Sequence, residues 1–195
     1  MNIANSVPVS DKKNTYHFIT RWVVNATSAE VYRTLEAVED LARWWPSVYL
    51  DVKQLEKGQP GGVGKLVALY TKGFLPYTLQ WKFRVTQTQF PIGFSLEAIG
   101  DFAGTGEWTF RDMNEEQCEV IYDWRIRAEK PLLKKLTWLL RPLFSANHQW
   151  AMRKGEESLK LELRRRKAAS DAERAAVPSP PGPVFPHNVT NNKVL

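Results

Sequence analysis

The sequence has little that could build a metal or redox site. It contains one cysteine, Cys118, which excludes an internal disulfide and a zinc site made of several thiolates. The three histidines, His17, His148 and His187, are far apart and show no ligand spacing such as HxxxH. Glycine-rich flavin or nicotinamide fingerprints and a GxSxG nucleophile elbow are also missing. We therefore predict no metal and no cofactor.

Long apolar runs are missing as well. No run approaches the roughly 18 residues needed to span a bilayer, and residues 1–14 lack the apolar core of a signal peptide. The single cysteine fits a reducing compartment. These features predict a cytoplasmic protein.

Composition divides the chain into three parts. Residues 1–14 are polar, and we expect a flexible segment there. Residues 168–195 are rich in alanine, proline and polar residues, which predicts a disordered tail. Between them, residues 15–167 form one predicted domain, and the 43% hydrophobic content of the chain is ordinary for a folded globular protein.

Alternating apolar and polar residues predict a sheet. The clearest case is the segment 76–88, where Tyr77, Leu79 and Trp81 share one face and Gln80 and Lys82 share the other. Such alternation is typical of an antiparallel sheet with one buried and one solvated face. The predicted strands are 15–25, 48–56, 64–72, 76–88, 92–100, 104–111 and 117–128, separated by glycine, proline or asparagine turns.

Helical patterns lie on either side of these strands. After the first strand, Thr27 and Glu30 form a capping box that begins a short helix reaching about Glu39. A second short helix covers about 41–45 and ends at Pro46. From Pro131 to about Lys167 the period is helical again, and we expect a break at Pro142.

This element order predicts an α+β fold with a curved antiparallel sheet of about seven strands wrapped around a long C-terminal helix. Two short helices follow the first strand. A helix that crosses the open face of a curved sheet encloses a space between the two layers.

Five motifs follow one another along the chain. In order, they are Trp22-x-Val24-x-Ala26, Trp44-Trp45-Pro46, Leu75-Pro76-Tyr77, Gly100-Asp101-Phe102-x-Gly104-x-Gly106-x-Trp108, and Arg141-Pro142-x-Phe144-x-x-Asn147-His148-x-x-x-Met152-x-x-Gly155. They resemble motifs of the SRPBCC superfamily, most closely its polyketide cyclase/dehydrase-like branch, and the resemblance covers about residues 15–165.

The resemblance implies a START-like helix-grip fold with a deep hydrophobic cavity. Members of the superfamily bind lipids, sterols, polyketides, quinones or plant hormones. Some catalyse cyclisation or dehydration, and many only bind or carry their ligand. Family membership therefore predicts a cavity better than it predicts a reaction.

His148 is the first candidate for a functional residue. It shares one face of the long helix with Met152, Gly155 and Leu159. If this face covers the sheet, a neutral imidazole there can hydrogen-bond a ligand or transfer a proton. The alternative is a histidine that ties the helix to a neighbouring carbonyl or carboxylate.

The other candidates lie on predicted strand faces. Expected ligand contacts, besides His148, are Tyr77, Trp81, Trp108, Tyr122, Trp124, Met152 and Gly155, although core packing explains the aromatic residues equally well. Asp101 is a weak second candidate for acid–base catalysis, since Gly100-Asp101 is also an ordinary turn pair. The pattern Gly104-x-Gly106 is not a phosphate loop, because no helix follows it.

Positive charge is concentrated near the C-terminus. Residues 130–167 contain eleven Lys or Arg and three Glu, a net charge of +8, while the whole chain carries +6. The segment 131–141 combines Lys134, Lys135 and Trp138 with many leucines, so it is either a lid on the cavity or a helix that lies at a membrane surface. No nucleic-acid module is present, and we expect no nucleic-acid partner.

Three functions follow. The first is a protein that binds or carries a small hydrophobic molecule, such as a lipid, a polyketide or a quinone-like compound. The second is a cyclase or dehydratase that uses His148 as an acid or base. The third is a lipid-handling protein that docks on an anionic membrane through the basic helix 131–141.

Overall fold

The middle of the chain forms one antiparallel sheet with the strand order β1-β7-β6-β5-β4-β3-β2. A computed structural model describes residues 14–129 and 131–184, and of residues 131–140 only the helix backbone. The strands are β1 (Thr15–Val24), β2 (Tyr49–Glu56), β3 (Leu66–Lys72), β4 (Thr78–Gln89), β5 (Gly93–Gly100), β6 (Phe102–Asp112) and β7 (Cys118–Ala128). The seven strands that the sequence predicts are confirmed, with ends shifted by at most two residues.

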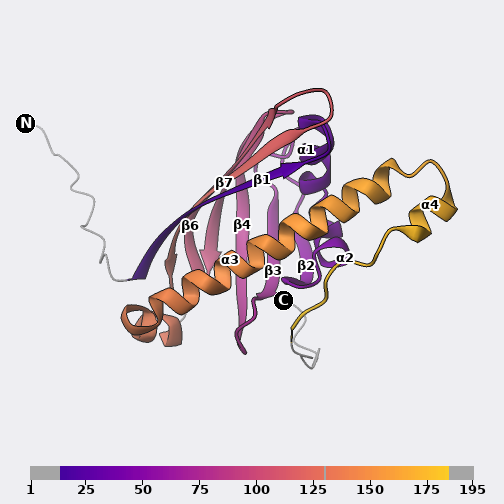
Figure 1. Ribbon diagram of the computed structural model, residues 1–195. Coiled ribbons are helices and arrows are strands. Elements are labelled where there is room, and N and C mark those ends of the chain that lie inside the picture. Colours follow the sequence, from indigo (N-terminus) through magenta and orange to yellow (C-terminus); the bar gives the residue numbers. More distant parts are fainter. Residues whose placement is uncertain (1–13, 130, 185–195) are drawn as a thin grey trace, which may run out of the picture.

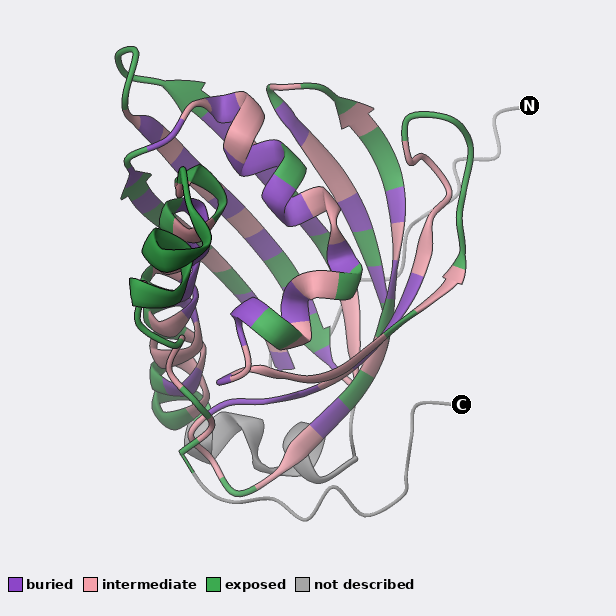
Figure 2. Cartoon of the chain, turned by 90° about the vertical axis from the view of Figure 1, so that its right-hand side faces the viewer, coloured by how far each residue is buried: buried purple, intermediate pink, exposed green. Residues whose placement is uncertain are grey.

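The strand faces also agree with the predicted alternation. On β4, Leu79, Phe83 and Val85 are buried, whereas Gln80 and Lys82 are exposed. The same alternation runs along β6 and β7 (Figure 2), whereas β3 buries Val67, Ala68 and Leu69 in succession. The buried residues face the concave side of the sheet, where they form the core with the helices.

Two short helices follow β1. Helix α1 (Ser28–Glu36) begins with the predicted capping box, in which Thr27 Oγ1 accepts a hydrogen bond from the Glu30 amide and Glu30 accepts one from the Thr27 amide. It ends three residues earlier than expected, and a single 3₁₀ turn (Val38–Asp40) leads into α2 (Leu41–Trp44).

The long helix α3 (Pro131–Lys167) crosses the concave face of the sheet (Figure 1). The residues on both sides of Pro142 are helical, so no non-helical residue separates two helices at this position. A proline removes one main-chain hydrogen bond from a helix. The Pro142 side chain is exposed, so its ring does not compete with the packed face of the helix.

Trp45 packs between α3 and the sheet. Its ring lies edge-on to Trp22 of β1, with centroids 5.9 Å apart, and 5.1 Å from the ring of Tyr49. On the helix side it lies against Gly155, where an added Cβ would be 2.1 Å from Trp45 Cζ2. The glycine is therefore explained by close packing on a tryptophan.

A buried carboxylate joins α3 to α2. Glu162 is 2% exposed and accepts two hydrogen bonds from Arg43, at 2.8 and 2.9 Å. Arg166 donates a further hydrogen bond from Nε to Glu162 at 2.8 Å and another to Asp40 at 3.0 Å. Burial raises the pKa of Glu162, but the hydrogen bonds and charges of Arg43 and Arg166 outweigh burial and hold it below the usual value.

The segment after α3 is partly structured. Residues 171–176 form helix α4 (Asp171–Ala176), capped by Ser170, and Arg165 donates hydrogen bonds to the carbonyl oxygens of Val177 and Pro178. Residues 185–195 of the predicted tail, and residues 1–13 of the predicted N-terminal segment, lie outside the described residues. Within the described part of the chain, no helix is both long and apolar enough to cross a membrane.

We expect Gly155→Ala to destabilise the protein. Alanine favours a helix by about 1 kcal/mol over glycine, but its methyl group would collide with the buried ring of Trp45. Overpacking of this kind lowers the free energy of unfolding by about 1–3 kcal/mol. Urea unfolding measures the change, with the exposed Gln149→Ala as control. A more stable Gly155→Ala protein would contradict this packing.

We expect Glu162→Gln to lower the free energy of unfolding by about 2 kcal/mol at pH 7. This is less than the roughly 3–5 kcal/mol typical of fully buried pairs, because the arginines are partly exposed. The pKa of Glu162 is lowered on folding, so its contribution is present above about pH 4.5 and is lost as the pH falls further.

Urea unfolding at pH 7 and below about pH 4.5 measures the difference in stability between the wild type and Glu162→Gln. The stability gap between the wild type and Glu162→Gln should narrow in acid. The matched control is Glu157→Gln. Glu157 pairs with Lys154 at the surface, so its substitution should change the free energy of unfolding by less than about 0.5 kcal/mol. A stability difference between the two proteins that widens in acid would contradict a lowered pKa of Glu162.

Candidate functional site

A cavity lies between the concave face of the sheet and the first half of α3. It is lined from β1, β2, β3, β4, β6 and β7, from the segment 45–48 before β2, and from α3 between Phe144 and Met152. Its volume is about 130 Å³. A smaller cavity of about 60 Å³ adjoins it and shares Trp45, Trp81 and Tyr122 with its wall.

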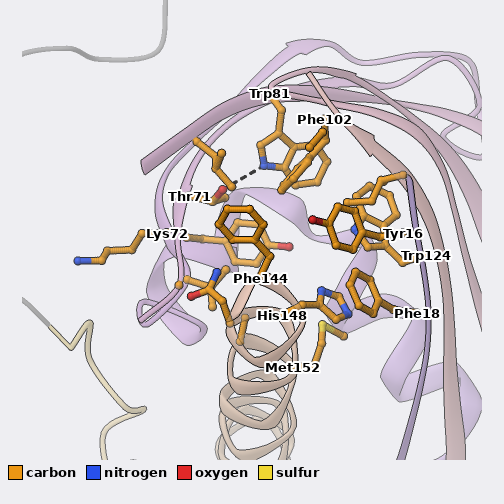
Figure 3. A pocket seen from close by; sticks show the side chains of 18 of the residues that line it. Tyr16, Phe18, Thr71, Lys72, Trp81, Phe102, Trp124, Phe144, His148 and Met152 are labelled. Atoms are coloured by element: carbon orange, nitrogen blue, oxygen red, sulfur yellow. Dashed lines mark hydrogen bonds between the residues drawn. The ribbon is translucent and has the colours of Figure 1, made fainter. Parts of the chain in front are cut away.

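Aromatic rings make up most of the wall (Figure 3). The described aromatic residues that line the cavity, besides His148, are Tyr16, Phe18, Trp45, Tyr49, Tyr77, Trp81, Phe102, Tyr122, Trp124 and Phe144. Several rings are fixed by stacking, including Tyr122 between Trp108 and Trp124, with centroid distances of 4.0 and 5.4 Å. Trp81 Nε1 donates a hydrogen bond of 3.0 Å to Thr71 Oγ1, so the wall is rigid as well as apolar.

Two glycines of β6 make room for this wall. A Cβ at Gly106 would be 2.7 Å from Tyr122 Oη and 2.8 Å from Trp124 Cε3. At Gly104, φ is +151° and a Cβ would be 2.0 Å from the carbonyl oxygen of Arg125. Gly106 therefore lets two large rings of β7 lie across β6, and Gly104 lets the main chain of β7 come close.

His148 lines the cavity, but its Nε2 atom is buried in the wall and has no hydrogen-bond partner. Its ring stacks on Phe18, with centroids 4.0 Å apart and planes 17° from parallel. The Nε2 atom is buried and no described residue hydrogen-bonds to it. Burial lowers the pKa of His148 to about 4, so the imidazole is neutral at physiological pH.

The tyrosine hydroxyls of the cavity are neutral too. Burial raises the pKa of Tyr77 to about 12. Burial also raises the pKa of Tyr49 and of Tyr122. Each hydroxyl therefore keeps its proton and can both donate and accept a hydrogen bond.

No carboxylate lines the cavity among the described residues. Lys72 is the single charged residue in the described wall, and only its aliphatic stem belongs to it, because the ammonium group points away from the cavity in Figure 3. The interior is therefore electrically neutral as well as largely apolar.

The β3–β4 loop closes one side of the cavity against α3. The Leu75 amide donates a hydrogen bond of 3.1 Å to Asn147 Oδ1, and Phe74 packs edge-on against Trp150. Gly73 permits this approach, since a Cβ there would be 2.2 Å from Asn147 Oδ1.

The family model described as polyketide cyclase/dehydrase and lipid transport matches residues 24–153. The chain belongs to this family. No curated protein sequence matches the chain.

Solved structures share the fold at low sequence identity. An aromatase/cyclase, Zhui, from Streptomyces sp. R1128 is 20% identical with a TM-score of 0.64, covering 80% of this chain and 98% of that one. A START superfamily protein from Mycobacterium smegmatis is 12% identical with a TM-score of 0.57, covering 73% and 98%. Norcoclaurine synthase from Thalictrum flavum is 14% identical with a TM-score of 0.55, covering 79% and 97%. The helix-grip, START-like fold is thereby confirmed.

Most predicted contact residues of this family member meet in the cavity. Its wall includes Tyr77, Trp81, Tyr122, Trp124, His148 and Met152. Trp108 lines the smaller adjoining cavity, and Gly155 lies against Trp45.

Asp101 lies outside the cavity. Its carboxylate accepts a hydrogen bond from the Gln80 amide at 2.9 Å, and its main chain bonds to Gln80 and Glu129. These are the contacts of a turn residue between β5 and β6. Cys118 is also remote from the wall, and burial raises the pKa of its thiol to about 11.

Several lining residues were missed from the sequence. Phe144 lies four residues before His148, so extending the helical face one turn back would have found it. Tyr16 and Phe18 are two residues apart on β1 and therefore lie on the same face of that strand. Trp45 and Asn147 carry no periodic signal, since one follows a short helix and the other lies beside the inner face of α3.

We expect His148 to stay neutral in the folded protein at pH values where a free histidine takes up a proton. In NMR titrations its ring signals should keep their neutral positions down to about pH 5. Because the pKa is lower in the folded than in the unfolded state, stability should fall as the pH drops from about 6.5 to about 4, by about 1–3 kcal/mol.

The variant His148→Phe should lack this part of the pH dependence, since it has no group to protonate at that position. Urea unfolding at a series of pH values compares the two proteins. A His148 ring that titrates near pH 6.5 would mean that the side chain is solvated.

Proposed function

We propose that this protein binds or carries a small, largely apolar molecule, such as a lipid, a polyketide or a quinone-like compound, between the sheet and α3. The observation that carries the proposal is the neutral cavity with a wall of rigid aromatic rings. Apolar surface removed from water stabilises a complex by about 25 cal/mol per Å². The few polar groups of the wall would fix the orientation of the ligand.

The described wall favours binding over catalysis. General acid–base catalysis usually pairs a proton donor with an acceptor held in hydrogen-bond reach of the reacting atoms. Here the groups within the cavity that can exchange protons are His148 and tyrosine hydroxyls whose pKa values are raised. The family's own description includes lipid transport beside cyclase and dehydrase activity.

A cyclase or dehydratase is the second candidate. The neutral side chain of His148 in the cavity wall favours it, because a neutral imidazole can take a proton from a bound substrate. The test is to release the bound molecule from the purified protein, incubate it with fresh protein, and measure its mass and absorption spectrum again. Loss of one water or a shifted ultraviolet spectrum indicates catalysis, and an unchanged molecule indicates a carrier.

Membrane docking through the helix 131–141 remains a prediction. The side chains of residues 131–140, including Lys134, Lys135 and Trp138, lie outside the described residues. Salt-sensitive binding to anionic vesicles that is lost when Lys134 and Lys135 are neutralised would support it. The cytoplasmic location also remains a prediction.

We expect native mass spectrometry of the gently purified protein to show a non-covalent mass that is released on denaturation. The matched variants are Ala151→Phe and Ala146→Phe, on the same helix. Ala151 lines the cavity, whereas Ala146 is exposed. The first variant should lose the bound molecule, or bind it at least about 10-fold more weakly, because its ring fills the space. The second should bind as the wild type does.

If both variants retain the bound molecule equally well, the assignment of this cavity as the binding site is contradicted. In that case the ligand lies elsewhere on the molecule. Circular dichroism of both variants shows whether each has kept its fold.

A further inference from the structure

Strand β1 leaves one long edge of the sheet open. It stands at the end of the strand order, and among the described strands only β7 pairs with it. Its register with β7 runs without a shift from Thr15 to Val24, whereas β2, at the opposite edge, has two register shifts. Proteins usually protect a free edge with bulges, prolines, lysines or short strands. The ten residues of β1 include no bulge, no proline and no lysine.

The odd-numbered residues of β1 direct their main-chain groups away from β7. The register places even-numbered residues of the two strands opposite each other, and the Ala128 carbonyl oxygen accepts a hydrogen bond from Asn14, just before β1. Glu129, the odd-numbered residue that follows β7, donates its amide to Asp101 beside β6 instead. Because bonding directions alternate along an antiparallel strand, the outward main-chain groups of β1 belong to His17, Ile19, Arg21 and Val23.

Two cations of α3 occupy the ends of this outer edge. Arg141 donates a hydrogen bond of 3.0 Å to the Thr15 carbonyl oxygen, and Lys167 donates one of 3.1 Å to that of Asn25. Both acceptors are odd-numbered, as the alternation requires. The two hydrogen bonds leave a free stretch, residues 17–23, between them.

Within this stretch the edge is exposed and partly apolar. No described residue hydrogen-bonds to its outward main-chain groups. The side chains of Ile19 and Val23 are 58% and 41% exposed. Helix α3 packs on the other face of the strand, where His148 stacks on Phe18. Unbonded main-chain groups beside exposed apolar side chains form a template for another extended strand.

A second copy of the same strand complements this edge. A twofold axis at Thr20 places His17 opposite Val23, and Ile19 opposite Arg21, of the second copy. Each facing pair exchanges two main-chain hydrogen bonds, so every outward group of the stretch finds a partner. An axis one residue away would bring a carbonyl that is already bonded to α3 into the ladder. An axis at Arg21 would also set this arginine opposite itself, which is unfavourable.

The charges on the convex face fit the same register. On β7, Asp123 lies beside Ile19, and Arg21 of the second copy would lie on the other side of this isoleucine. The next row repeats the order, with Glu119 on one side of Val23 and a histidine of the second copy on the other. Each row therefore reads carboxylate, apolar residue, cation, and no two like charges stand opposite each other.

We propose that this protein forms a twofold dimer in which two copies of β1 pair antiparallel, centred on Thr20, and join the two sheets into one. The dimer depends on the strand edge and not on a ligand, so it stands or falls independently of the proposed function. Tyr16 and Phe18 of the same strand line the cavity. Pairing would therefore also hold one wall of each cavity in place.

Sedimentation velocity over a range of protein concentrations tests the dimer and its register. The wild type should pass from monomer to dimer as the concentration rises. Ile19→Lys sets two lysines opposite arginines and should weaken the dimer about 10-fold, whereas Ile19→Glu creates two pairs of opposite charge and should strengthen it about 3- to 10-fold. The matched control is Ile99→Lys, at a similarly exposed isoleucine of the inner strand β5, which should leave the dissociation constant unchanged.

Amide hydrogen exchange of the wild type tests the same edge without a substitution. The amides of Thr20 and Trp22 bond to β7 and should be protected at every concentration. Those of Ile19 and Arg21 point outward and should be protected only in the dimer. Circular dichroism shows whether each variant has folded, and where one has not, the exchange measurement decides.

The contrary outcomes are distinct. A protein that stays monomeric up to about 0.5 mM overturns the proposal. Protection of the Ile19 and Arg21 amides in a monomer means that the chain covers its own edge, which overturns it too. A dimer that neither Ile19→Lys nor Ile19→Glu alters forms through another surface. If both substitutions weaken the dimer equally, the register centred on Thr20 is overturned.

Discussion

The packing of Trp45 between α3 and β1 is the contact on which the site depends. A long helix across a curved sheet would otherwise settle onto it and fill the space with side chains, as protein interiors usually do. The indole lies on Gly155 at one side and on Trp22 at the other. Further along, Glu162 fastens the helix to Arg43. The first half of the helix is thereby held above a cavity that remains open.

The neutrality of this cavity follows from the way its polar groups are buried. Burial disfavours the charged form of each group, so it lowers the pKa of His148 and raises the pKa of the tyrosines. Ionic groups are found on the convex side instead, where Asp123 pairs with Arg125 and Glu119 with Arg21. The sheet thus separates a charged outer surface from a polarisable interior.

The sequence predicted those features that repeat along the chain. Alternation placed Leu79, Trp81 and Tyr122 on the inner face, and a helical period placed His148 above them. It did not reveal the role of Trp45, because a residue at the end of a short helix belongs to no period. The helical residues on both sides of Pro142 were also not predicted, since the helix-breaking tendency of proline is a local rule that packing of the neighbouring turns can override. Distances across the sheet decide which rings line the main cavity and which do not. Trp108, for example, lines only the smaller adjoining cavity.

Three tryptophans in the wall, Trp45, Trp81 and Trp124, have an optical consequence. Indole emission shifts in wavelength with the polarity around the ring, and an aromatic guest that absorbs nearby can quench it by energy transfer. A guest in this cavity would sit against these three fluorophores. The protein therefore carries its own reporter of occupancy, and its ligand can be sought in mixtures by light alone, without a label on either molecule.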